Sequence, residues 1–299
     1  MVAKACTEGI LIKVDDFMRT KSIRSVLALN QELMAWYKEH DAEKPVAVLV
    51  QGETRYNDLI PYMERLSERY NVLVVEAITT HFEYLFKEDD INEAIEFYYT
   101  LLYVKLLEAG FNKVELFTGH CFGADLAYRL ACRWQQDYPD QEPNVCMLDS
   151  FWVDQNRKLK RPQLDLTISL LPESMQKEIG IMSSEQDEIL DMYSRLNCKG
   201  APAPLHGKVL LISAALKENV LADLSKKLNI SEGQILSMLQ MDSEQLRKAL
   251  IPQREFDNVA LWKKYRSDLI WQKAEGNHMT MLHESCVATF IQFVFDNIK

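Results

Sequence analysis

The stretch Val114-Glu115-Leu116-Phe117-Thr118-Gly119-His120-Cys121-Phe122-Gly123-Ala124 decides how the rest of the chain is interpreted. It begins as an apolar run typical of a buried strand, and a glycine stands two places before and two places after Cys121. The apolar positions that follow have the spacing of one helix face: Leu126, Ala127, Leu130 and Ala131. We therefore predict a strand that turns sharply into a helix, with Cys121 at the apex of the turn.

The two glycines have a physical reason. A strand that reverses directly into a helix holds its apex residue in a strained backbone conformation, and side chains at the flanking positions would collide with the neighbouring strand and helix. The N-terminus of the helix then lies under the sulfur, where its partial positive charge favours a thiolate. This is the layout of a nucleophile elbow with cysteine in place of the usual serine, so Cys121 is the predicted nucleophile.

Two later stretches supply an acid and a histidine. Residues 145–150 form a short apolar run that ends in Asp149, and residues 276–282 contain His278. The chain order nucleophile, acid, histidine is the order of an α/β-hydrolase. Three weak signals in this order together predict a catalytic triad of Cys121, Asp149 and His278.

The rest of the chain alternates between apolar runs and helical apolar faces, which predicts an α/β fold with a mostly parallel, doubly wound sheet. Besides the elbow strand, strands are expected at 46–50, 72–75, 145–149, 208–213 and 269–272. Gly52, Cys121 and Asp149 then fall at the carboxyl ends of strands. The active crevice of such a sheet lies at these ends.

Two stretches interrupt the alternation and are predicted to be helical insertions. The first, at about 151–204, follows the acid-bearing strand, where α/β-hydrolases place a lid, and we expect it to be a mobile lid over the elbow. The second, at about 216–250, contains paired amphipathic helices that form either a small satellite core or a docking surface. The hydrolase domain is expected to span 45–299, after an N-terminal helical segment at 1–40.

Composition excludes several other classes of protein. The 299-residue chain has a formal net charge of −10, which argues against nonspecific nucleic-acid binding. A helix needs about 18 apolar residues to span a bilayer, and no apolar run approaches that length. The N-terminus also lacks the hydrophobic core of a signal peptide. A cytoplasmic protein with reduced thiols is therefore expected. The six cysteines show no CxxC pairing and the histidines no HExxH spacing. Neither a metal site nor a disulfide framework is therefore predicted.

The motifs together resemble the thioesterase domains that end nonribosomal peptide and polyketide assembly lines, within the α/β-hydrolase superfamily. Residues 119–127 resemble their Gly-His-Ser-x-Gly-Gly-x-x-Ala elbow, 148–150 their Leu-Asp-Ser, and 276–282 their Gly-Asp-His-Phe-x-Met-Leu. The resemblance covers about 46 to 298 without the two insertions. The departures from the pattern include Cys121 for serine, Ala124 for the second glycine, Asn277 for aspartate, and Gln51-Gly52-Glu53 for His-Pro-x-Gly-Gly.

The resemblance implies a role for each of these residues. Cys121 would attack the thioester of a chain carried on a phosphopantetheine arm, His278 would transfer the protons, and Asp149 would fix the imidazole tautomer. The backbone N–H groups of Phe122 and of Gly52, or of Glu53, would hold the oxyanion. His120 would point away from the sulfur and pack structurally. No cofactor is implied in this chain. The partner would be a carrier domain that delivers the acyl chain, and the enzyme is expected to be a monomer.

The residues leave alternatives open. A dienelactone-hydrolase-like enzyme also has a Gly-x-Cys-x-Gly elbow but takes its acid after the following strand, where this chain offers only Glu218. A catalytically inactive hydrolase fold used for docking is the rival from another class. Within the thioesterase interpretation, release by hydrolysis, cyclisation or amide formation stays open. The segment around Asp16, Phe17 and Ser22 resembles the end of a carrier domain, which would make the chain part of a longer synthetase.

Overall fold

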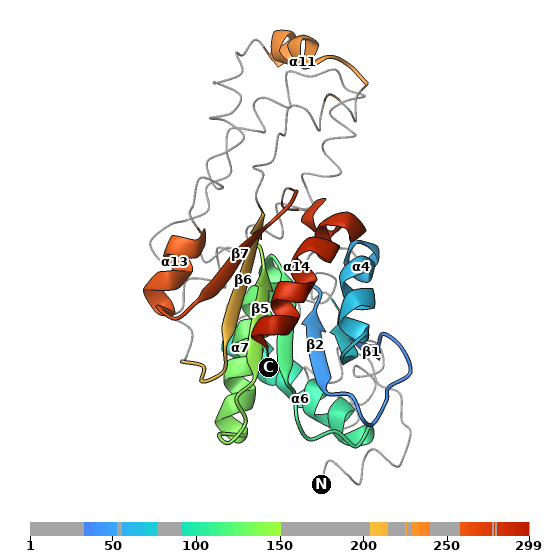
Figure 1. Cartoon of the computed structure of the whole chain (residues 1–299), viewed down its shortest axis with the longest axis vertical. Helices are drawn as coiled ribbons and strands as arrows, with labels where there is room; N and C mark the ends of the chain where they lie inside the picture. The colour runs from blue at the N-terminus through green and yellow to red at the C-terminus, as the bar shows by residue number, and fades with distance from the viewer. Residues whose placement is uncertain are drawn as a thin grey trace. The chain divides into compact units, whose positions relative to one another are not determined.

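The computed structural model describes residues 33–52, 56–76, 91–150, 204–214, 225, 229–239, 258–276, 278 and 280–298. The described residues build a seven-stranded sheet in the order β1-β3-β2-β4-β5-β6-β7 (Figure 1). Strand β1 (Met34–Trp36) pairs antiparallel with β3, and every other neighbouring pair is parallel. The mostly parallel, doubly wound sheet predicted from the sequence is confirmed.

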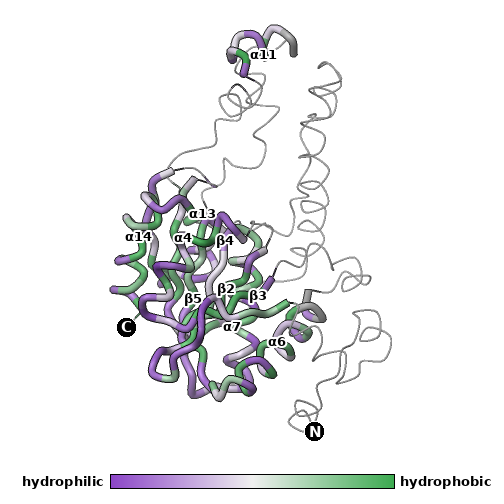
Figure 2. The backbone as a smooth tube through the Cα atoms, turned by 90° about the vertical axis from the view of Figure 1, so that its right-hand side faces the viewer, coloured by the Kyte–Doolittle hydropathy of each residue, from purple (hydrophilic) through white to green (hydrophobic). Residues whose placement is uncertain are grey.

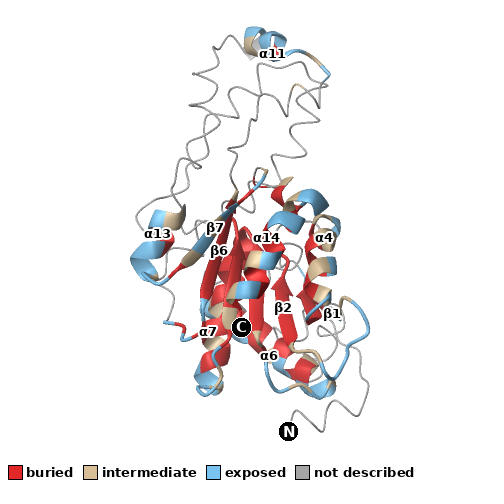
Figure 3. Cartoon of the chain, viewed as in Figure 1, coloured by how far each residue is buried: buried red, intermediate tan, exposed pale blue. Residues whose placement is uncertain are grey.

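The predicted strands agree with the observed ones to within two residues. The remaining strands are β2 (Val46–Val50), β3 (Asn71–Val75), β4 (Leu116–His120), β5 (Asn144–Leu148), β6 (Val209–Ala214) and β7 (Ile270–Ala274). The helices are α4 (Tyr56–Ser67), α6 (Ile91–Glu108), α7 (Phe122–Asp137), α11 (Glu232–Leu239), α13 (Asn258–Tyr265), α14 (Glu284–Asn297) and the 3-10 turn η2 (Thr280–Leu282). All five residues of β2 are buried (Figure 3), as a central strand of a parallel sheet requires.

Helices cover both faces of the sheet. On one face, apolar side chains of α4 and α14 pack against alternate strand residues such as Leu49, Leu148 and Ile212 in a single core. Hydrophobic and hydrophilic residues alternate along α4 and α14 in Figure 2, as expected of helices with one side in a core. On the other face, Trp134 of α7 contacts Phe117 of β4 with ring centroids 6.4 Å apart. The sheet that carries the predicted site is therefore fixed between two helical layers.

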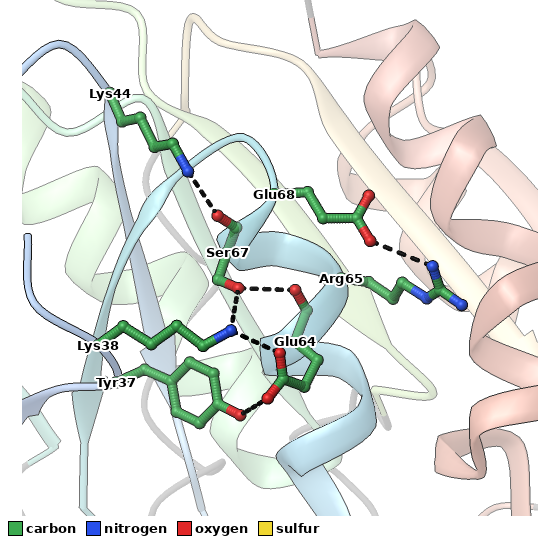
Figure 4. Close-up of polar contacts among 7 residues, drawn as sticks. All are labelled: Tyr37, Lys38, Lys44, Glu64, Arg65, Ser67 and Glu68. Carbon is green, nitrogen blue, oxygen red and sulfur yellow. Dashed lines mark hydrogen bonds and ion pairs between the residues drawn. The ribbon is translucent and has the colours of Figure 1, made fainter. Parts of the chain in front are cut away.

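The sequence prediction is wrong for residues 34–36, which it placed in an N-terminal helical segment. They form an edge strand, because pairing with β3 satisfies backbone groups that a helix would satisfy locally. Polar contacts then tie the loop after β1 to α4 (Figure 4): Glu64 accepts from Tyr37 and from Lys38, each at 2.6 Å. These exposed contacts contribute little individually. The segment around Asp16, Phe17 and Ser22, which resembles the end of a carrier domain, lies outside the described residues.

Contacts divide the chain into two compact units, Met1–Trp152 with Lys199–Ala215 and Asn258–Lys299, and Val153–Cys198 with Leu216–Asp257. Nearly all of the predicted lid lies outside the described residues. Within the second predicted insertion, α11 is a helix whose first turn is capped reciprocally. The backbone N–H of Ser231 donates to the Gln234 side chain at 2.8 Å, and the backbone N–H of Gln234 donates to the Ser231 hydroxyl at 3.3 Å.

The described part of the chain lacks two features. None of its helices is both long enough and apolar enough to cross a membrane. No group of three or more histidine, cysteine, aspartate or glutamate side chains in the same residues is arranged to hold a metal ion.

Candidate active site

The strand-turn-helix predicted at the elbow is confirmed, and Cys121 stands at its apex. Strand β4 ends at His120 and α7 begins at Phe122, so a single residue makes the turn. Cys121 has φ 55° and ψ −121°, a conformation that non-glycine residues rarely adopt. Its backbone N–H donates to the carbonyl of Leu148 at 2.8 Å, which ties the strained residue to the adjacent strand.

Backbone atoms meet around the elbow where the glycines stand. A Cβ added at Gly119 would lie 2.4 Å from the carbonyl carbon of Gly123, and one at Gly123 would lie 2.3 Å from the carbonyl oxygen of Val50. Gly52 has φ +63°, and a Cβ there would lie 2.4 Å from the Gly123 nitrogen. The end of β2 therefore lies directly against the first turn of α7. This is the region in which the oxyanion hole of Gly52 and Phe122 is predicted; Glu53 lies outside the described residues.

Asp149 follows β5 and is held by three hydrogen bonds. Its own backbone N–H donates to the carbonyl of Ile212 at 2.7 Å, and its Oδ1 accepts from the backbone N–H of Ala214 at 3.0 Å. Its Oδ2 lies 2.7 Å from Nδ1 of His278. These contacts hold Asp149 at φ 45°, so the predicted acid, like the predicted nucleophile, occupies a strained backbone position at a strand end.

Opposing effects act on the pKa of Asp149. Burial alone would raise the pKa, but the hydrogen bond and charge of His278, the Ala214 N–H and the charge of His120 together lower it below the usual range. A lowered pKa means that the carboxylate stabilises the folded state above about pH 4. That contribution is lost as the pH falls through the lowered pKa. At neutral pH the group facing His278 is therefore a carboxylate.

His278 lies between β7 and η2 and is buried, with 6% of its surface exposed. The tight turn before it depends on Gly276, which has φ +90° and on which a Cβ would lie 2.7 Å from Thr280 Oγ1. Because the Asp149 carboxylate only accepts hydrogen bonds, Nδ1 of His278 carries the hydrogen and donates it. Nε2 is therefore the nitrogen that can take a proton in a reaction. The structure thus brings Asp149 and His278 together as the sequence predicted.

His120 was expected to point away from the sulfur and to pack structurally, and it has a defined partner in the structure. It is fully buried, and its Nε2 lies 2.8 Å from the backbone carbonyl oxygen of His278. The two imidazole rings have centroids 4.3 Å apart with 36° between their planes. Sequence reasoning missed this contact, since the two residues are 158 positions apart.

A second buried contact was also missed. The hydroxyl of Ser150, the residue after Asp149, donates to Oδ1 of Asp125 in the first turn of α7. Both residues are almost fully buried. A charged residue in an otherwise apolar first turn was the only signal in the sequence. The contact links the elbow helix to the residue that follows the acid.

The other buried cysteines differ from Cys121 in their surroundings. Cys132 lies within α7 and Cys146 within β5, and burial raises the pKa of each thiol to about 12. Thiols of this kind stay protonated and unreactive at neutral pH. The prediction that both are packing residues agrees with their burial.

No family model matches the sequence, and no curated protein matches it. Solved structures match its fold. The thioesterase domain of NocB, in covalent complex with a fluorophosphonate nocardicin G analog, is 14% identical, with a TM-score of 0.54 over 89% of this chain and 100% of that chain. The type II thioesterase BorB from the borrelidin biosynthetic cluster is 14% identical, with a TM-score of 0.52 over 89% of this chain and 96% of that chain.

A larger protein contains a similar domain. The four-domain nonribosomal peptide synthetase AB3403, bound to AMP and glycine, is 13% identical, with a TM-score of 0.57 over 92% of this chain and 22% of that chain. At these identities the likeness is one of fold. Together with the sheet order, it assigns the α/β-hydrolase fold to this chain.

Proposed function

We propose that this protein is a thioesterase-type acyl transferase that releases a carrier-bound peptidyl or polyketide chain through an acyl-Cys121 intermediate. The observation that carries the proposal is the 2.7 Å contact of Asp149, which follows β5, with His278, in the loop after β7. Cys121 stands at the strained elbow that follows β4, the strand beside β5. The likeness in fold to thioesterase domains supports the reaction class.

The proposed reaction has two halves. In the first, Nε2 of His278 takes the proton of the Cys121 thiol, and the sulfur attacks the thioester carbonyl of the incoming chain. Backbone N–H groups of Phe122 and Gly52 stabilise the oxyanion. The tetrahedral intermediate collapses, the carbon–sulfur bond to the phosphopantetheine arm breaks, and His278 returns the proton to the departing thiolate.

In the second half, a nucleophile attacks the acyl-Cys121 carbonyl while His278 takes its proton. The nucleophile is water, an amine or a group within the acyl chain, and the Cys121 thiol leaves with the proton. Asp149 keeps the imidazole in the required tautomer in both halves. The residues need no metal or bound cofactor for this chemistry. The carrier domain that delivers the substrate is the partner, either upstream in a longer chain or in trans.

Covalent capture of the acyl group tests the proposal. Wild-type protein mixed with acyl-pantetheine thioesters of several chain lengths is expected to gain the mass of the acyl group and to release free pantetheine thiol. Intact-mass and peptide measurements should place the adduct on Cys121. Cys286 of α14 is half-buried and serves as the internal control, because it should stay unmodified. Acylation of another residue, or no thiol release with any thioester, would contradict the proposal.

The position of the acid separates this proposal from a dienelactone-hydrolase-like enzyme. Asp149→Asn is expected to reduce kcat by about 10⁴-fold, because an amide no longer holds the catalytic tautomer. Glu218→Gln, at the alternative position outside the described residues, should leave kcat nearly unchanged. Steady-state kinetics on one thioester substrate measures both variants. A crippled Glu218→Gln with a mild Asp149→Asn would favour the dienelactone-type arrangement.

A further inference from the structure

We propose that His120 is a positioning residue that fixes the backbone of the loop carrying His278. Its Nε2 lies 2.8 Å from the carbonyl oxygen of His278. A carbonyl oxygen only accepts, so Nε2 of His120 carries the hydrogen and donates it. The kinetic part of this inference rests on the proposed function, whereas the geometry does not.

One hydrogen bond does not fix an imidazole. The contact with Asp149 holds Nδ1 of His278, and a contact at one ring atom does not by itself define the orientation of the ring. His120 adds two further constraints, the hydrogen bond to the His278 backbone and the ring contact at 4.3 Å. With the base held at its side chain, its ring face and its backbone, Nε2 keeps one direction.

The register of the sheet explains why His120 is suited to this task. His120 is paired with Leu148 across β4 and β5, so the next residues on the two strands are Cys121 and Asp149. The predicted nucleophile and acid are thus each one residue beyond a register pair. His120 links the same strand end to the base, which comes from a distant part of the chain. His120, the residue before Cys121, therefore helps to fix the position of His278.

Packing alone is the competing explanation, because His120 is fully buried against another ring. The two roles make opposite predictions for substitutions. Glutamine keeps an N–H donor near the position of Nε2 but has no ring. Phenylalanine keeps the ring and loses the donor, and methionine matches the length of glutamine without a donor.

The experiment compares His120→Gln, His120→Met and His120→Phe by two readouts. Loss of the donor is expected to lower kcat by about 10- to 100-fold, since small displacements of catalytic groups have effects of this size. KM should stay within about twofold, because the change removes an interaction that matters in the transition state. His120→Gln should recover most of the lost activity.

The second readout needs no turnover. The rate of Cys121 alkylation by iodoacetamide reports activation of the thiol by its base, and Cys286 in the same sample is the reference. We expect the order wild type, His120→Gln, then His120→Met together with His120→Phe. If no variant or wild-type protein turns over thioesters, the proposed function fails while the alkylation order still supports or refutes the inference.

Two results would overturn the inference. Equal alkylation rates in all variants would show that the donor is dispensable. Highest activity in His120→Phe would assign the residue to ring packing. Thermal unfolding of each variant accompanies both assays, and if His120→Phe does not fold, the length-matched glutamine and methionine variants decide the question.

Discussion

Cys121→Ala and His278→Ala are each expected to abolish acyl release, with kcat lowered by about 10⁴- to 10⁶-fold, because a nucleophile and its base act as a unit. For the same reason the double variant should be no slower than the slower single variant. Single-turnover assays with an acyl-pantetheine thioester measure the loss, and mass spectrometry should detect no adduct in Cys121→Ala.

The control for this experiment is Cys286→Ala, a thiol of α14 outside the candidate site, which should keep wild-type activity. Thermal unfolding should show that each variant is still folded at the temperature of the assay. Full activity of either Cys121→Ala or His278→Ala would end the catalytic interpretation. A hydrolase fold used only for docking would then be the remaining hypothesis.

Most of the sheet was predictable because its central strands are buried on both faces. Continuous apolar runs such as Val46–Val50 leave few alternatives to a central parallel strand. The three-residue strand β1 was not predictable, because its pattern also fits a helix and only pairing with β3 decides the outcome. Local sequence thus predicts the centre of the sheet better than its edge.

The candidate site was predictable where a residue sits in a local motif. Cys121 and Asp149 follow from strand ends, and the strained backbone at both positions agrees with the glycines and the abrupt end of the apolar runs. The partners of His120 and Asp125 were not predictable, since each hydrogen bond joins segments far apart in the chain. Such contacts exist only after the strands are aligned side by side.

The proposed cysteine nucleophile would have a chemical consequence for the product. Transfer of a chain from a carrier thioester to serine makes an oxygen ester and discards much of the reactivity of the thioester. Transfer to Cys121 exchanges one thioester for another at nearly equal free energy, so the bound acyl group stays activated. Amines attack thioesters more readily than oxygen esters, and a thiolate is the better leaving group. We therefore propose that an amine or an internal nucleophile captures acyl-Cys121.

Cys121→Ser is the deciding variant, because serine keeps the geometry of the elbow and changes only the intermediate. With a substrate that carries an internal amine, the wild-type enzyme is expected to give mainly cyclic or amide product. The serine variant should shift the products toward the free acid and slow aminolysis by about tenfold or more, since the oxygen ester reacts poorly with amines. Chromatography with mass detection measures the ratio of amide or ring to acid. A serine variant that forms as much of the same cyclic or amide product would show that the thioester intermediate confers no advantage, and the enzyme would then be a hydrolase in which cysteine merely replaces serine.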